Sequence, residues 1–253
     1  RSDPADRPNP PKRRLRAHRN YKVKFTTLTS DGYTAGTGPC GYEIRALGTI
    51  PGEHAEVRLE HVSPHRPLAW GRILKITQKS PNRVSPPCVR AARCGGCPWM
   101  HLAYVAQVAE KQKRLRALLE NLRQNLLADD ARPNAAPLNP STVFVEPSPQ
   151  TIHYRNRGKY ILARKARGIV VGAYRPRTHR VSSTLGCPVV EPPVDVAAKG
   201  LSGLLAQTEL SIYNEKTRSG VLRYAGVRAN LDGEVLATLV VTERKDEDTI
   251  QAI

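Results

Sequence analysis

Four of the five cysteines have a spacing typical of a metal centre. Cys88, Cys94 and Cys97 lie within ten residues in the pattern C-x5-C-x2-C, and Cys187 follows much later, directly before Pro188. The two glycines between Cys94 and Cys97 allow the backbone to turn tightly. Three neighbouring thiolates and one remote thiolate could therefore bind one centre.

Two kinds of metal group accept four cysteine ligands, Zn²⁺ and a [4Fe–4S] cluster. Structural zinc sites usually combine two close cysteine pairs, or one pair with histidines, whereas this chain offers a triplet and one distant cysteine. The spacing favours the [4Fe–4S] cluster, with zinc as the alternative and free thiols without metal as the least favoured. Cys40 has no neighbouring cysteine, so we expect an ordinary thiol.

The charge of the chain predicts a polyanionic partner. It contains 40 Lys and Arg against 22 Asp and Glu, a formal net charge of +18, which produces a positive potential over much of the surface. Nucleic acid is the first candidate, and basic residues that serve only solubility are the alternative. We expect no membrane partner and a cytoplasmic location, because the chain has neither a long apolar run nor a leader pattern. The sequence does not indicate an oligomeric state.

Residues 21–80 are expected to form a small antiparallel β-barrel like the oligonucleotide-binding fold. Short runs with strand character alternate with turn signals at 30–32 and 51–52. These runs are 21–28, 42–50, 55–61 and 70–77. Residues 36–41 match the letters of the dinucleotide-binding G-x-G-x-x-G, but no helix pattern follows them, so we reject that function.

The rest of the chain predicts an overall class of mixed β and α+β. Residues 1–20 are expected to be a disordered basic arm, 81–130 a cysteine segment with an amphipathic helix at 102–127, and 131–150 a proline-rich linker. Residues 151–253 are expected to form an α+β central domain. Its elements are hairpins 152–162 with 169–174 and 221–229 with 234–242, and a helix at 194–210.

Two basic runs in this domain are candidate RNA-binding segments. One lies in the first hairpin, where cations alternate with Tyr154 and Tyr160, and the other lies in the following loop. Alternation along a strand would put the cations on one face and the tyrosines on the other, where they could simply be core. Internal hydrogen bonds are the alternative role of the cations. The candidates are Arg155, Arg157, Lys159, Arg164, Arg175 and Arg177.

The cysteine segment, with Pro98-Trp99-Met100-His101-Leu102, Gln107 and Lys111, resembles that of the RNA 5-methyluridine methyltransferases of the 23S ribosomal RNA type. Residues 50–53 resemble the end of that family's TRAM barrel, and Tyr154-Arg155-Asn156-Arg157 resembles its central-domain entry strand. Further segments resemble the family in the same order, namely 172–175, 187–189, 222–224 and 233–236. The resemblance covers roughly residues 21–245.

The resemblance implies that the barrel and the central domain bind structured, ribosomal RNA. It also implies that Cys88, Cys94, Cys97 and Cys187 hold a [4Fe–4S] cluster as a structural staple. In that family a further domain binds S-adenosylmethionine and supplies a nucleophilic cysteine and a glutamate base, which uracil 5-methylation requires. No cysteine follows Cys187. We therefore expect the catalytic residues and the S-adenosylmethionine site to lie outside this chain.

Two other functions remain open from the sequence. One is a standalone iron–sulfur or zinc RNA-binding module without enzymatic activity. The other is an unrelated redox protein with a cysteine cluster, which the net charge of +18 disfavours.

Overall fold

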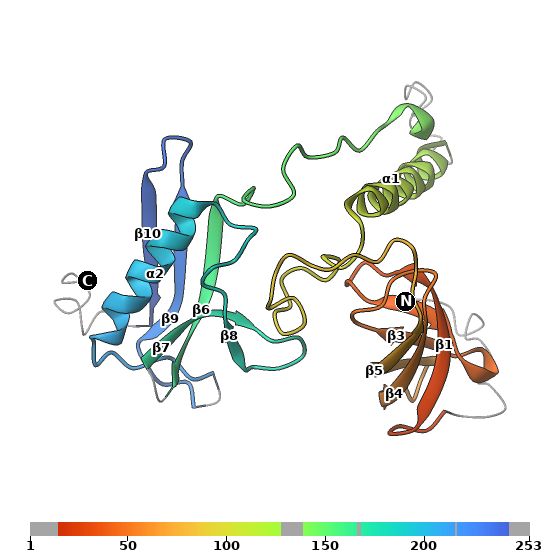
Figure 1. Ribbon diagram of the computed structural model, residues 1–253, viewed down its shortest axis with the longest axis horizontal. Helices are drawn as coiled ribbons and strands as arrows, with labels where there is room; N and C mark the ends of the chain where they lie inside the picture. Colours follow the sequence, from red (N-terminus) through yellow and green to blue (C-terminus); the bar gives the residue numbers. More distant parts are fainter. Residues whose placement is uncertain (1–14, 128–138, 166–167, 216, 243–253) are drawn as a thin grey trace. The chain divides into compact units, whose positions relative to one another are not determined.

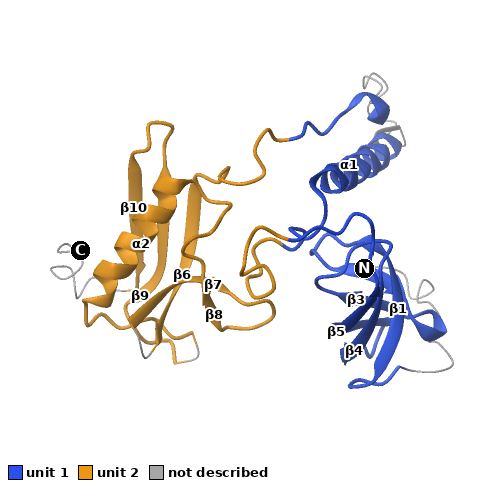
Figure 2. Cartoon of the chain, in the orientation of Figure 1, with its two compact units in different colours: residues 1–85, 98–147 blue, residues 86–97, 148–253 orange. Residues whose placement is uncertain are grey.

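The computed structural model describes most of the chain in two compact units (Figure 2). The described residues are 15–127, 139–165, 168–215 and 217–242. Unit 1 comprises residues 1–85 and 98–147, and unit 2 comprises residues 86–97 and 148–253. The cysteine segment and the following helix, which are expected together in 81–130, fall into different units, because residues 86–97 belong to unit 2. Residues 1–14 of the expected basic arm lie outside the described residues. The expectation of disorder is wrong for residues 15–20, because Leu15 is buried in the barrel core and Asn20 begins β1.

Unit 1 contains the predicted small barrel. Five strands close on themselves in the order β1-β2-β3-β5-β4 (Figure 1). They are β1 (Asn20–Leu28), β2 (Thr34–Thr37), β3 (Glu43–Ala46), β4 (His54–Val62) and β5 (Leu68–Gln78). The strand β2 was not predicted, and β3 pairs parallel with β5, so the barrel is not purely antiparallel.

The glycine-rich stretch at 36–41 belongs to the barrel wall. An added Cβ on Gly36 would lie 2.2 Å from the carbonyl oxygen of Lys24, so the close approach of β1 and β2 requires glycine here. The short 3-10 helix η2 (Pro39–Gly41) follows β2, and the chain then enters β3. The long helix that a dinucleotide site needs is replaced by a strand, which agrees with the rejection of that motif.

Alternation along the strands builds the barrel core. In β4 the inward side chains Ala55, Val57 and Leu59 are almost completely buried, while Arg58 and Glu60 between and beyond them are exposed. Phe25 of β1 is also fully buried. Burial of Val57, Leu59 or Phe25 stabilises the fold by about 1.5–3 kcal/mol for each side chain.

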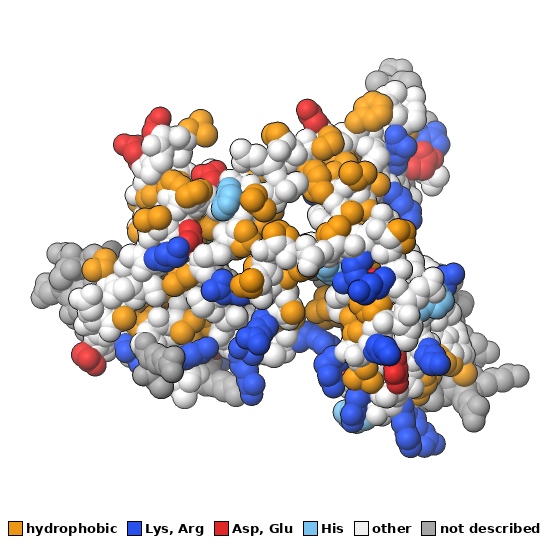
Figure 3. Space-filling view, viewed as in Figure 1, with side chains coloured by type: hydrophobic (Ala, Val, Ile, Leu, Met, Phe, Trp, Pro, Cys, Tyr) orange, Lys and Arg blue, Asp and Glu red, His pale blue; other side chains and the backbone are white. Residues whose placement is uncertain are grey.

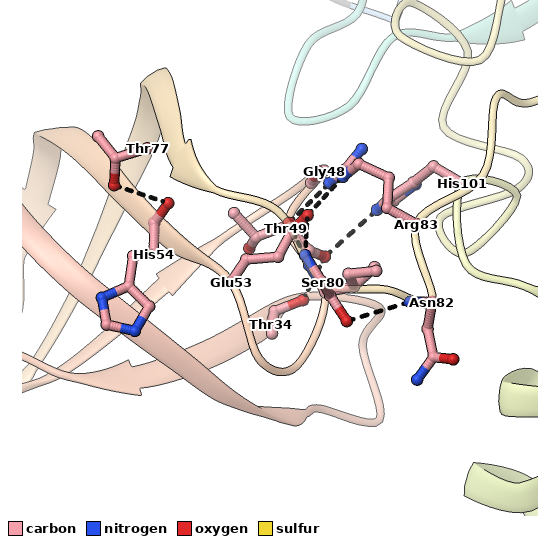
Figure 4. A network of polar contacts seen from close by, with 11 residues as sticks. Thr34, Gly48, Thr49, Glu53, His54, Thr77, Ser80, Asn82, Arg83 and His101 are labelled. Atoms are coloured by element: carbon pink, nitrogen blue, oxygen red, sulfur yellow. Dashed lines mark hydrogen bonds and ion pairs between the residues drawn. The ribbon is translucent and has the colours of Figure 1, made fainter.

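A polar network closes one end of the barrel (Figure 4). The carboxylate of Glu53, which is fully buried, accepts hydrogen bonds from the Arg83 guanidinium and from the amides of Ile50 and Ser80. The Arg83 side chain also donates to the carbonyl of Gly48. These contacts join the end of β5 to the turn between β3 and β4.

The helix α1 (Tyr104–Leu127) follows in unit 1, as predicted. Arg114 attaches it to the barrel, because its guanidinium donates to the carbonyls of Leu28 and Thr29 at 2.8 and 3.1 Å. The same group lies 4.6 Å from the ring centroid of Trp99. The side-chain amide of Gln112 donates to the Val143 carbonyl at 2.8 Å, in the segment that contains the 3-10 helix η3 (Pro140–Thr142).

The apolar side chains of the predicted amphipathic helix are not buried in the described part of α1. Val105, Leu118 and Leu122 are 80%, 67% and 48% exposed, and no described residue of α1 is buried. The side chain of Leu126 lies outside the described residues. The helix is held instead by the polar contacts of Arg114 and Gln112 and by partial burial of Ala106. No helix in the described part of the chain is both long and apolar enough to cross a membrane.

Unit 2 is an antiparallel sheet with one helix on it (Figure 1). The strand order is β10-β9-β6-β7-β8. The strands are β6 (Arg157–Lys165), β7 (Gly168–Tyr174), β8 (Val181–Ser183), β9 (Leu222–Ala229) and β10 (Val235–Val241). Both predicted hairpins and their common sheet are confirmed, although β6 begins at Arg157 instead of Ile152 and β8 was not predicted.

The helix α2 (Pro192–Ala206) covers one face of this sheet. Its buried side chains, Val194, Ala198, Leu201 and Leu205, repeat at helical spacing and pack with the inward residues of β6, β7 and β9. Proline at the first helical position begins α2 without the loss of a backbone hydrogen bond. The described part of unit 2 contains no other α-helix, so the second face of the sheet is left without a helical cover.

Candidate functional site

The first three cysteines lie in a series of tight turns in residues 86–97. The Cys88 carbonyl accepts a hydrogen bond from Ala91 at 3.1 Å, and the Arg90 carbonyl accepts from the amides of Arg93 and Cys94, both at 2.8 Å. These turns fold the segment back on itself. An ideal Cβ on Gly96 would lie 3.5 Å from the Cys94 sulfur, so the glycine leaves room beside the thiol.

Cys187 reaches the same unit from the turn after β8. Gly186 before it has a φ of +72°, and its amide donates to the Asp195 carboxylate of α2 at 2.6 Å. Directly after Cys187, the amide of His153 donates to the Pro188 carbonyl at 2.8 Å. The amide of Arg155 donates to Val189 at 2.9 Å. This short pairing fixes Cys187 beside the entry to β6.

The other three predicted ligand cysteines lie near enough to Cys97 for their charges to act on its thiol. All four are partly buried and free of disulfides. Burial raises the pKa of the Cys97 thiol, and the nearby thiolates of Cys187, Cys94 and Cys88 raise it further, while Arg155 opposes them. A metal bound to these sulfurs would stabilise their thiolate forms against burial and mutual repulsion. The donor set therefore fits a metal group bound through sulfur.

The side chains as they stand do not form a ready single-ion site. The described residues contain no group of three or more His, Cys, Asp or Glu side chains placed to hold one metal ion. A zinc ion would require four sulfurs that converge to about 2.3 Å from one point. The fit to a metal therefore rests on the donor chemistry of the four cysteines and on their proximity.

The first basic run is divided between two places. Arg155 lies before β6 and acts on Cys97, whereas Arg157 and Lys159 lie on β6 with exposed side chains. Tyr160 points to the opposite, buried face, and its burial, with the nearby Asp195 and Cys187, raises its pKa to about 12. The alternation that predicts a core role for Tyr160 is confirmed. Tyr154 precedes the strand and is 52% exposed, so it does not take the core role that alternation left open for it.

Arg164 is separated from the other predicted cations. Its guanidinium donates to the carbonyls of Leu210 and Thr208, at 2.8 and 3.3 Å, in the segment after α2. It lies at an odd spacing from Arg157 and Lys159, so strand alternation directs it to the side that α2 covers. The structure thus gives Arg164 a role in holding the chain after α2.

The second basic run forms the turn between β7 and β8. The amide of Arg175 donates to the Arg180 carbonyl at 2.9 Å, and Arg177 has a φ of +56°. An added Cβ on Gly95 would lie 3.4 Å from Pro176, so the turn borders the cysteine segment. The structure therefore places Arg155, Arg175 and Arg177 near the cysteines and leaves Arg157 and Lys159 on the sheet.

The prediction missed two residues on the same sheet. Tyr224 and Arg228 of β9 share a face with Arg157 and Lys159, because Arg228 is the register partner of Arg157. The Lys159 ammonium lies 4.5 Å from the ring centroid of Tyr224. The period of two from Tyr224 to Arg228 could have indicated this face from the sequence. Figure 3 shows Lys and Arg side chains on the visible surface of both units.

Comparison with known proteins relates the chain to RNA methyltransferases. It is 34% identical over 221 residues to an uncharacterized RNA methyltransferase of Gloeobacter violaceus, which covers 87% of the chain and 45% of that relative. It is 32% identical to an uncharacterized RNA methyltransferase from Nostoc, over 77% of this chain and 40% of that relative. It is 30% identical to one from Geobacter sulfurreducens, with 88% and 42% covered. The chain spans less than half the length of these curated relatives.

A solved structure shares the fold. The crystal structure of Pyrococcus abyssi tRNA (uracil-54, C5)-methyltransferase in complex with S-adenosyl-L-homocysteine matches 92% of this chain and 48% of its own. The TM-score is 0.59 and the sequence identity is 24%. No family model matches the chain. The β-rich fold with a closed barrel is thus one that a tRNA methyltransferase also uses.

Proposed function

We propose that this chain is the RNA-recognition and [4Fe–4S]-binding portion of an S-adenosylmethionine-dependent ribosomal RNA uracil-5-methyltransferase. In this proposal the barrel is a TRAM domain, residues 151–253 belong to the central RNA-binding domain, and methyl transfer needs a domain beyond residue 253. The relatives named RNA methyltransferases support the class of reaction. The neighbour whose structure contains S-adenosyl-L-homocysteine supports the methyl donor.

The observation that carries the proposal is the gathering of four cysteines within unit 2. Cys88, Cys94 and Cys97 come from one segment and Cys187 from a turn about ninety residues later. The other three nevertheless lie near enough to raise the pKa of the Cys97 thiol. A cluster bound by all four thiolates would supply a rigid cross-link between these segments. The protein positions the ligands through the turns at Arg90 and the hydrogen bond from Gly186 to Asp195.

The basic residues beside the cysteines support RNA as the partner. Arg155 and the turn that carries Arg175 and Arg177 border the ligand segment, in a chain of net charge +18. Guanidinium groups bind phosphate through charge-assisted hydrogen bonds. If the cluster holds the segment against this turn, loss of the cluster would also disturb the basic surface.

The proposal is tested by metal analysis of anaerobically purified protein. We expect about four irons and four sulfides per chain and a broad absorption band near roughly 400 nm. A Cys187→Ser variant should lose them, while Cys40→Ser, which removes a thiol of unit 1, should keep them. One zinc per chain without colour would favour the standalone zinc module instead.

The RNA part is tested separately by binding of transcripts. Filter binding of the intact chain to ribosomal RNA and tRNA transcripts should show salt-dependent affinity, stronger for ribosomal RNA. The double variant Arg155→Gln with Arg175→Gln should bind several-fold more weakly at equal ionic strength. A chain that binds neither RNA would contradict the proposal, and a preference for tRNA would correct its substrate.

A further inference from the structure

The face of the unit 2 sheet opposite α2 combines cations, an aromatic ring and apolar side chains. It contains a shallow depression of about 500 Å³ across three neighbouring strands, β6, β9 and β10. We call it the open sheet face. Its outward side chains belong to Arg157, Lys159, Tyr224, Arg228, Leu236, Thr238 and Val240, with Gly226 at its centre.

Two arginines of this face stand directly opposite each other. Arg157 of β6 and Arg228 of β9 are register partners in the antiparallel pair, and both side chains are exposed. Like charges at directly opposed positions destabilise a sheet. No ion pair with a described acidic residue compensates either guanidinium. An anion placed between them would relieve this repulsion.

An aromatic ring lies next to these cations. Tyr224 is four residues before Arg228 on the same face of β9. The Lys159 ammonium lies 4.5 Å from the centroid of the Tyr224 ring. Burial raises the pKa of Tyr174, and Glu215 and Tyr224 raise it further, so these side chains lie within electrostatic range of Tyr174. Cations interleaved with aromatic rings are the arrangement that single-stranded nucleic acid uses, with bases on rings and phosphates on cations.

The centre of the face is flat and its edge is apolar. Gly226 has no side chain, and an added Cβ would meet Thr238 at an ordinary 3.7 Å, so packing does not require glycine here. On β10, Leu236 and Val240 are 66% and 42% exposed. A flat, partly apolar floor beside cations suits the faces of bases and riboses. A purely apolar partner would bury Arg157 and Arg228 without counter-charge, which is costly.

We infer that the open sheet face binds single-stranded RNA. In this inference the Tyr224 ring takes a base on the face that Lys159 does not cover, and Arg157 and Arg228 take the backbone phosphates. The inference rests on the proposed RNA function but assigns part of the binding to a surface other than the arginines beside the cysteines. A folded RNA would thereby contact unit 2 through an unpaired segment as well as through its phosphates.

The first test is fluorescence anisotropy of a labelled single-stranded oligoribonucleotide of about 12 nucleotides with the intact chain. Tyr224→Leu should weaken binding by roughly 5- to 150-fold, because stacking on one ring contributes about 1–3 kcal/mol per base. Tyr224→Phe keeps the ring and should bind nearly as the parent does. Circular dichroism and thermal unfolding of both variants check that the sheet remains folded.

A second pair of variants separates the face from general charge. Gly226→Glu places a carboxylate in the centre of the face, whereas Gly203→Glu places one on α2, where an added Cβ meets nothing within 4 Å. Both change the net charge equally, but only Gly226→Glu should abolish oligonucleotide binding. Arg228→Gln should also reduce the slope of log affinity against log salt by about one.

The outcomes distinguish this inference from the function it rests on. If Tyr224→Leu and Gly226→Glu bind the oligonucleotide like the parent while the Arg155 and Arg175 double variant fails to bind RNA, the open sheet face is not an RNA surface. The proposed function then stands. If the two variants change only self-association or contact with another protein, the face is a protein interface and the inference is wrong. A parent chain that binds no RNA overturns both.

Discussion

Arg83 holds the buried carboxylate of Glu53 through two parallel hydrogen bonds. Its Nε lies 2.5 Å from one carboxylate oxygen and its Nη2 lies 2.7 Å from the other. The Glu53 side chain is fully buried and that of Arg83 is 19% exposed. The amides of Ile50 and Ser80 also donate to the Glu53 carboxylate. This pair fixes the point at which the chain leaves the barrel.

Arg83→Met should destabilise unit 1 by about 3–5 kcal/mol, because it leaves the Glu53 carboxylate buried without its cation. Urea unfolding followed by Trp fluorescence measures the change. The matched control is Arg72→Met, whose partner Glu60 lies 3.7 Å away on the surface. That substitution should cost no more than about 1 kcal/mol. Equal effects of the two substitutions would show that the buried pair has no special role.

Acid should destabilise the barrel end in two stages. Burial lowers the pKa of His101 below 6.5, and the charge of Arg83 lowers it further. The hydrogen bond to the Thr49 carbonyl and the charge of Glu53 oppose this shift. Between that lowered pKa and 6.5 the unfolded state binds more protons, so the free energy of unfolding falls as the pH falls below about 6.5. His101→Gln should flatten this first stage in urea titrations at successive pH values.

The second stage belongs to Glu53. Burial alone would raise its pKa, but the hydrogen bonds and charge of Arg83 and the amides of Ile50 and Ser80 outweigh it, so the pKa lies below 4.5. Its contribution is present above 4.5 and is lost as the pH falls through the lowered pKa. A His101→Gln chain that still loses stability between pH 6.5 and 4.5 as steeply as the parent would contradict the assignment of the first stage.

Two glycines of α2 can be replaced to stabilise unit 2. An added Cβ on Gly200 or Gly203 meets nothing within 4 Å, and both lie in the helix interior. Each change to Ala should raise the free energy of unfolding by roughly 0.5–1 kcal/mol, because glycine loses more backbone entropy. Gly172→Ala is the contrasting case, since its Cβ would collide with the Ser182 carbonyl. In thermal unfolding, the melting temperature should rise for Gly200→Ala and Gly203→Ala and fall for Gly172→Ala.

Removal of the metal group should loosen unit 2 and spare unit 1. If the four cysteines hold a cluster, chelation or oxidation removes the cross-link between residues 86–97 and Cys187. Limited proteolysis with mass spectrometry should then show new cuts in 86–97 and around Cys187, while the barrel strands resist as before. Cuts that appear equally in β4 and β5 would mean that the loss acts on the whole chain.

The sequence alone determined the local elements, because their patterns are short-range. Alternation in 55–61 and the turn signals around it predicted β4, and helical spacing predicted α1 and α2. The spacing of the cysteines likewise predicted a set of four metal ligands. The sequence could not predict β2, because the small residues Thr34–Thr37 carry no apolar alternation and form a strand only through their neighbours β1 and β3.

The tertiary structure decided what long-range contacts control. Strand register placed Arg228 opposite Arg157 and Tyr224 beside Lys159, and no local pattern specifies a partner more than sixty residues away. Arg164 likewise does not share a face with Arg157 and Lys159, because it lies at an odd spacing from them along β6. The approach of Cys187 to Cys97 depends on the pairing of 153–155 with 188–190, which only the folded chain supplies. Spacing thus proposed the chemistry, and packing determined which side chains share a surface.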